Sequence, residues 1–247
     1  MRIYLLLFVT AVAALSSPAV AQVIDPYSTD YFTKVTWDDI NRRTSEQAKQ
    51  AQPSAAQSTP QRTPPKKATP KKAAARPTAL NFQPTGSLAQ SRGVNVLVAQ
   101  YQGEQQAAMR TNYVAMISSF NDSVPRLYGV QKNNLATGTA ALLTGAYVAY
   151  NNRPFPDAWV KPLVQQLEST MASDASLANA PNLDKETAYQ VMVGTGMVLQ
   201  VTQAELAKTP DAHKAAELRK AGAEVFRVMG IAEPSRVQFS QAGISFR

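Results

Sequence analysis

Residues 133–151 read NNLATGTAALLTGAYVAYN, and this stretch decides the fold. No charged side chain occurs in it, and every residue from Leu135 to Tyr150 is apolar, small or a tyrosine. A helix that is apolar on all faces is either buried in a protein core or placed in a membrane. The apolar part covers about 16 residues, fewer than the ~20 that a membrane span needs. We therefore expect a central helix buried within a helical domain.

Small residues recur at every fourth position of this helix, at Thr137, Ala141, Gly145 and Ala149. Such a stripe lets the backbone of a neighbouring helix approach closely. The same spacing also occurs on the dimer face of membrane helices. We favour close packing inside the domain, because the apolar segment is short.

Hydrophobic spacing predicts four further helices around the central one. The third helix in chain order has Trp159, Leu163 and Met171 on one face, and the fourth contains Gly194 and Gly196, which we expect to serve close packing. Gly230 is placed to end the fifth. The predicted ranges are Val94–Asn121 with a possible break at Gly103, a helix starting at Asp157, Asp184–Lys208 and Asp211–Met229.

Short alternating segments at both ends of the domain predict strands. Residues 79–83 alternate before Pro84, and residues 237–240 and 244–246 alternate on either side of a turn. Because a lone hairpin is marginally stable in water, we expect residues 79–83 to join it as a third strand. The predicted fold is mainly α: a bundle of about five helices over residues 79–247, with a small antiparallel β-sheet formed by the two ends of the domain.

Residues 1–21 have the pattern of a secretory signal peptide. Arg2 precedes an apolar run from Ile3 to Leu15, and Ala19-Val20-Ala21 is a small-x-small cleavage site that would leave Gln22 as the new N-terminus. An uncleaved N-terminal anchor is the alternative. The chain contains no cysteine, so it has neither a lipoprotein anchor site nor disulfides. We expect a periplasmic or secreted bacterial protein.

Residues 22–41 form a short aromatic segment that contains Tyr27, Tyr31, Phe32 and Trp37. Thr36 followed by two aspartates resembles a helix start and allows a helix over residues 37–50. The segment is either a peptide that docks on a partner or a strap that packs on its own domain.

Residues 42–78 form a Pro/Ala/Lys-rich linker that carries nearly all of the net charge of +8. Residues 42–76 hold nine basic groups and one acidic group, whereas residues 77–247 hold 14 basic and 12 acidic groups. This composition predicts a disordered, extended spacer. Its lysines either keep the spacer soluble or bind an anionic polymer; the candidate contacts are Lys66, Lys67, Lys71 and Lys72.

Residue types that carry catalysis or bind metals are scarce. His213 is the one histidine, and its neighbours Asp211 and Glu217 suggest an exposed helix turn rather than a catalytic pair. With one histidine and no cysteine, the usual zinc sites lack ligands. We expect no catalytic, cofactor-binding or metal-binding residues.

Three other groups of residues have ordinary structural explanations. Gly194-Thr195-Gly196 lies inside a helix pattern and lacks the lysine of a phosphate loop. Asp184 and Glu186 suit a helix N-terminus. The aromatic residues Tyr147, Tyr150 and Trp159 could line a pocket, but core or rim packing is the favoured interpretation.

From Leu80 onward the sequence resembles an uncharacterised bacterial family, the domain of unknown function numbered 6683. The resemblance rests on Leu80-Asn81-Phe82, on the helix that ends Gly145-Ala146-Tyr147-Val148-Ala149-Tyr150, on Gln165-Gln166-Leu167, on Leu183-Asp184-Lys185-Glu186 and on Gly243-Ile244. It covers about two thirds of the chain. The resemblance implies an exported helical domain behind a variable linker, and it implies no activity or functional residue.

Three functions follow as hypotheses. The first is a non-enzymatic accessory or interaction protein of the bacterial envelope, whose helical domain binds a protein partner. The second is a binder of envelope polysaccharide or DNA through the basic linker. The third is an enzyme with a carboxylate-based site that the sequence does not reveal.

Overall fold

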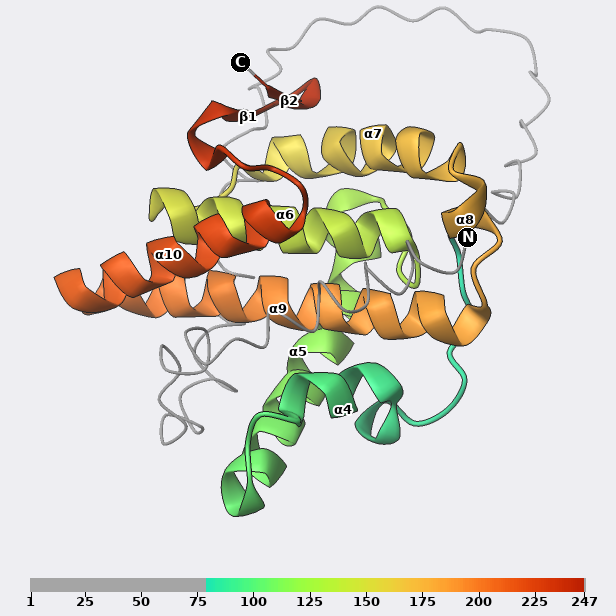
Figure 1. Cartoon of the computed structure of the whole chain (residues 1–247), viewed down its shortest axis with the longest axis horizontal. Coiled ribbons are helices and arrows are strands. Elements are labelled where there is room, and N and C mark those ends of the chain that lie inside the picture. The colour runs from blue at the N-terminus through green and yellow to red at the C-terminus, as the bar shows by residue number, and fades with distance from the viewer. Residues whose placement is uncertain (1–78, 247) are drawn as a thin grey trace, which may run out of the picture.

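The computed structural model describes residues 79–246 (Figure 1). The predicted signal peptide, aromatic segment, helix over 37–50 and basic linker lie outside these residues. The described part contains α4 (Arg92–Val98), α5 (Gly103–Tyr128), α6 (Leu135–Asn151), α7 (Val160–Ala172), α8 (Ala175–Ala178), α9 (Asn182–Lys208), α10 (Ala212–Val228), β1 (Val237–Ser240) and β2 (Gly243–Phe246), with 3₁₀ turns η3 (Leu88–Gln90), η4 (Asp157–Trp159) and η5 (Pro234–Arg236). The prediction of a mainly α fold with a small antiparallel sheet is confirmed.

Helix α6 lies at the centre of the bundle, as predicted, and packs against α7, α9 and α10. Its residues from Leu135 to Ala149 are all buried. The helix begins after Asn134, whose side-chain oxygen accepts the backbone N–H groups of Ala136 and Thr137 and so satisfies two free donors of the first turn. Within residues 79–246, no helix is long and apolar enough to cross a membrane.

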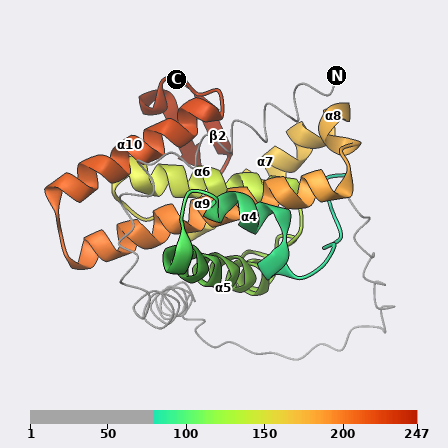
Figure 2. The ribbon, with the colours of Figure 1, turned by 60° about the horizontal axis from the view of Figure 1, so that its bottom comes forward.

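Helix α9 is a second buried axis of the bundle. It contacts α6 and α10, and also α4 and α5. Figure 1 shows α4 and α5 on the opposite side of α9 from the hairpin, and in the view of Figure 2 α4 lies in front of α9 with α5 beyond it. Nearly every residue from Lys185 to Leu206 is buried. Helices α4 and α5 therefore cover a part of α9 that α6 and α10 do not cover.

Glycines bring the backbones of α6 and α9 into direct contact. A Cβ at Gly145 would lie 2.7 Å from the Gly196 Cα, and a Cβ at Gly196 would lie 2.6 Å from the Ala141 carbonyl carbon. Gly222 of α10 meets the α6 backbone in the same way, 2.7 Å from the Tyr150 nitrogen. The predicted role of the small-residue stripe is therefore confirmed.

The predicted break at Gly103 is also confirmed. Gly103 has a φ of +54°, and it separates α4 from α5. Gly230, with a φ of +82°, follows the end of α10 as expected.

The prediction that residues 79–83 join the C-terminal sheet is wrong. The sheet has two strands, β1 and β2, within the described residues. Asn81 instead forms an isolated bridge with Asn134, and the Leu135 N–H donates to the Leu80 carbonyl at 3.1 Å. The start of α6 thus supplies the backbone partners that the extended segment needs.

Helix α7, and not residues 79–83, supports the outer edge of the hairpin. The side-chain amide of Gln166 donates to the Ile244 carbonyl at 2.9 Å and accepts the Ile244 N–H at 2.7 Å. The Gln166 side chain therefore makes the two backbone hydrogen bonds that a third strand would make with Ile244 at the outer edge of β2. This contact stabilises a hairpin that would be marginal alone.

Candidate functional site

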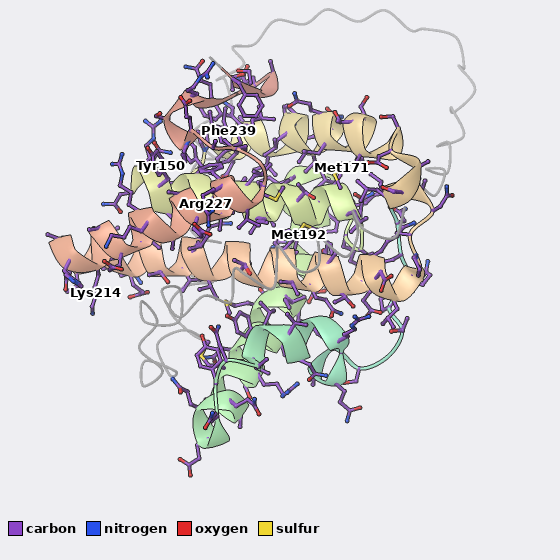
Figure 3. The ribbon with its side chains drawn as sticks, viewed as in Figure 1. Tyr150, Met171, Met192, Lys214, Arg227 and Phe239 are labelled. Carbon is purple, nitrogen blue, oxygen red and sulfur yellow. The ribbon has the colours of Figure 1, made fainter. Side chains whose placement is uncertain are left out.

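A cavity of about 280 Å³ lies where the end of α6 meets the hairpin and the end of α10. Tyr147, Tyr150, Trp159, Phe226 and Phe239 give it an aromatic wall. Figure 3 shows Tyr150 and Phe239 together at this end of the molecule, whereas Lys214 lies at the far end of α10. We refer to this cavity as the aromatic pocket.

Phe239 of β1 organises the rings around the pocket. Its ring lies edge-on to Tyr147 and to Phe155, each at a centroid distance of 5.3 Å, and 6.5 Å from Phe226. Edge-to-face pairs at such distances are favourable beyond their buried area. The rings therefore hold the hairpin onto the bundle while leaving space beside them.

Two arginines stack on the tyrosines of the pocket. The Arg153 guanidinium lies 5.2 Å from the centre of the Tyr147 ring, and that of Arg219 lies 4.5 Å from the centre of the Tyr150 ring. Both arginines are exposed to solvent, and Arg153 is the one charged side chain in the pocket lining. Because the lining contains Arg153 and no Asp or Glu, its formal charge is positive.

Two acidic residues that are close in sequence to the pocket lining, Asp157 and Glu233, already have partners. Asp157 of η4 accepts the Tyr128 hydroxyl at 3.0 Å, and Glu233 lies 3.9 Å from Arg236. Burial, followed by the Asp157 charge, raises the pKa of Tyr128 well above its usual value. The Tyr128 phenol therefore remains a donor to Asp157 at neutral pH.

Strand β1 has an open edge beside the pocket. Phe239 is opposite Ile244, and the Ile244 backbone groups point outward to Gln166, so these two residues form a non-hydrogen-bonded pair. The N–H and C=O of Phe239 consequently point away from β2. Within residues 79–246 no third strand pairs with this edge, and an unpaired strand edge is the kind of site to which an extended peptide can add.

The structure brings together the three aromatic residues considered in the sequence, Tyr147, Tyr150 and Trp159, and all three line the pocket. Tyr147 and Tyr150 also pack against other rings. The sequence reasoning missed Phe226, Phe239 and Arg153. Phe226 falls within the predicted helix Asp211–Met229 and Phe239 within the predicted strand 237–240, and nothing in their local spacing shows that they meet α6.

The residues around His213 make the contacts of an ordinary helix N-terminus. His213 is exposed in the first turn of α10. Asp211 caps that helix by accepting the Lys214 N–H at 3.0 Å, which lowers the pKa of Asp211, and Glu217 pairs with Lys220 at 2.6 Å. These contacts match the predicted exposed helix turn.

Asp184 and Glu186 are only two positions apart, but they differ in burial and in hydrogen-bond partners. Asp184 pairs with Arg92 at the surface at 3.4 Å. Glu186 is 3 % exposed, and its carboxylate accepts the Thr85 hydroxyl at 2.6 Å, the Thr85 N–H at 3.1 Å and the Gln190 amide at 3.1 Å. Glu186 therefore holds the segment around Thr85 against α9, a role beyond that of a negative charge at a helix N-terminus.

Gly194 and Gly196 lie inside α9, as predicted. A Cβ at Gly194 would lie within 3.2 Å of the Tyr113 ring, and Gly196 meets α6. Across residues 79–246, no group of three or more His, Cys, Asp or Glu residues is arranged to hold a metal ion.

A family model matches the whole chain, residues 1–247. The chain belongs to the Family of unknown function (DUF6683). The resemblance seen from Leu80 onward is thus confirmed and extends over the N-terminal residues as well. No curated protein and no solved structure matches this DUF6683 chain.

Proposed function

We propose that this DUF6683 chain is an exported, non-enzymatic interaction protein of the bacterial envelope. Its helical module binds a protein partner, and the basic linker sets how far the module reaches. The signal-peptide pattern of residues 1–21 supports export. The acid-free lining of the aromatic pocket supports binding over carboxylate-based catalysis.

The observation that carries this proposal is the aromatic pocket at the open edge of β1. An extended segment that adds to a sheet edge gains affinity from main-chain hydrogen bonds and specificity from side-chain pockets. The pocket offers aromatic surface for an apolar side chain, and Arg153 favours acidic neighbours. The partner is therefore a protein with an extended, acidic segment that contains an aromatic residue.

Site-specific photo-crosslinking in the producing cells tests this function. A photoreactive amino acid replaces Gln238, which lines the pocket, or Lys214, which is exposed at the far end of α10. We expect one protein to crosslink at position 238 and not at 214, and Arg153→Glu to reduce its yield. Equal capture at both positions, or none at 238, would contradict the proposal.

Export is tested separately by fractionation. We expect the wild-type chain to appear outside the cytoplasm without residues 1–21. Replacing Ala19 and Ala21 with leucine removes the small residues that the cleavage site requires. The longer precursor should then accumulate, and a wild-type chain that keeps residues 1–21 in the cytoplasm would refute export.

The charge of residues 42–76 supports a second proposal, that the linker binds an anionic polymer of the envelope or DNA. Binding would then fall steeply with salt. Replacing Lys66, Lys67, Lys71 and Lys72 with glutamine should weaken retention on an anionic polysaccharide or DNA. Equal retention of wild-type and substituted chains would end this second proposal.

A further inference from the structure

We propose that residues 22–41 of this same chain occupy the aromatic pocket and the open edge of β1. This inference rests on the proposed function, because it takes the pocket as a binding site, and it names the occupant that a partner has to displace. It follows from the charges of the segment and of the pocket, from the residue types of the segment beside the outward backbone groups of β1, and from the length of the connecting chain.

Charge is the first argument. Residues 22–41 contain four aspartates, Asp25, Asp30, Asp38 and Asp39, and one lysine. In the pocket lining the one charged side chain is Arg153, and Arg219 stacks on the neighbouring Tyr150. The acidic segment is thus complementary to the pocket, whereas the basic linker that follows it is not.

Side-chain chemistry is the second argument. Residues 31–37 read YFTKVTW, in which aromatic and β-branched residues predominate, and such residues favour strands. A strand added at β1 can bond to the outward N–H and C=O of Phe239. Trp37 then provides a ring for the aromatic wall, immediately followed by the acidic pair Asp38 and Asp39.

Reach is the third argument. The chain enters the described part beside α8 and the start of α9, across the molecule from the hairpin (Figure 1). The 37 residues 42–78 can extend over a maximum of roughly 115 Å. A compact domain of this size is about 40 Å across. A covalent link of this length also gives the segment a high local concentration at the pocket.

Engineered cysteines test the proposal directly, because the full chain contains none of its own. Asp38→Cys is combined with Gln238→Cys at the pocket or with Lys214→Cys at the far end of α10. A short bis-maleimide should link the first pair within one chain about tenfold more than the second, corresponding to about 1.4 kcal/mol. Equal yields, or a product that joins two chains, would overturn the proposal.

Fluorescence gives an independent readout, because Trp37 and Trp159 are the two tryptophans of the chain. In a Trp159→Phe chain, Trp37 reports alone. We expect its emission to be blue-shifted and shielded from acrylamide, and Arg153→Glu to return it to solvent-exposed values. The variant with Asp38→Asn and Asp39→Asn should also shift the Trp37 emission towards solvent-exposed values, although it changes no residue of the helical domain.

The outcomes separate this inference from the proposed function. If Trp37 is exposed while position 238 captures a partner, residues 22–41 are not the occupant and the interaction function stands. If Trp37 is shielded and position 238 captures no other protein, the segment is the occupant and the partner hypothesis fails.

Discussion

The α6–α9 crossing and the hairpin end of the molecule are packed by opposite means. At the crossing, Gly145 and Gly196 remove side chains so that two backbones touch. At the hairpin end, Phe239 and Tyr147 meet through large rings held edge to face. Backbone contact leaves no room for a ligand, whereas rings packed at angles leave a cavity of about 280 Å³. The difference distinguishes a crossing that is closed by backbone contact from an end of the bundle that contains a cavity.

The largest expected effect is at the crossing. In Gly196→Ala the new methyl group overlaps the Ala141 carbonyl, so α6 and α9 must separate. We expect the free energy of unfolding to fall by about 3 kcal/mol, measured by urea denaturation. Gly86→Ala is the matched control, because no atom lies within 4 Å of its Cβ position. If Gly196→Ala lowers the free energy of unfolding no more than Gly86→Ala does, α6 and α9 are not tightly packed at this crossing.

A slightly smaller effect is expected where the chain enters the bundle. Glu186→Ala leaves the Thr85 and Gln190 donors without their carboxylate. The cost should be about 2 kcal/mol in urea denaturation, with faster hydrogen exchange at Thr85. Asp184→Asn, in the same turn but at the surface, should change stability by less than about 0.5 kcal/mol. Similar losses for both variants would refute the buried role of Glu186.

Alkaline pH should weaken the helical part through its buried phenols. Burial raises the pKa of both Tyr128 and Tyr189 above the usual value. Because the folded state disfavours their ionised forms, stability is complete below pH ~10 and is lost above it, by about 1.4 kcal/mol per group and pH unit. Urea midpoints at pH 8 and 11 measure this fall. Tyr189→Phe should make it smaller, and an unchanged fall would refute the assignment to Tyr189.

The smallest expected effect concerns the hairpin. Gln166→Ala removes both side-chain bonds to Ile244. We expect a loss of about 1 kcal/mol, with faster hydrogen exchange confined to residues 237–246. Gln165→Ala, on the exposed side of the same helix, is the control. If exchange rises equally throughout the helices, the hairpin is not a separate unit of stability.

Local rules predicted most of the helices. The apolar stretch of α6, the start of α10 near Asp211 and the stop at Gly230 all depend on a few neighbouring residues, so the sequence reveals them. Contacts between distant segments were harder to predict. Leu80 pairs with the start of α6 because its backbone partners there are free, and the alternation of residues 79–83 cannot distinguish this from a sheet.

The pocket was hard to predict for the same reason, because it is formed by segments that are distant in sequence. Tyr147 and Tyr150 follow from the α6 pattern, but Phe239, the ring partner of Tyr147, is about ninety residues further along the chain. The buried state of Glu186 was missed for a related reason. An acidic residue in a helix N-terminal turn is ordinarily solvated, and only the path of Thr85 across it creates a buried bond.

The attachment of the chain at residues 79–85 has a mechanical consequence. Lys185 donates to the Ala79 carbonyl, Asn182 bonds to both backbone groups of Gln83, and Glu186 accepts from Thr85. All three anchors join residues 79–85 to the first turns of α9, so tension arriving from upstream is transmitted to the start of that one helix. A lower rupture force for Glu186→Ala than for the wild-type chain in an optical-tweezers trace would record that load.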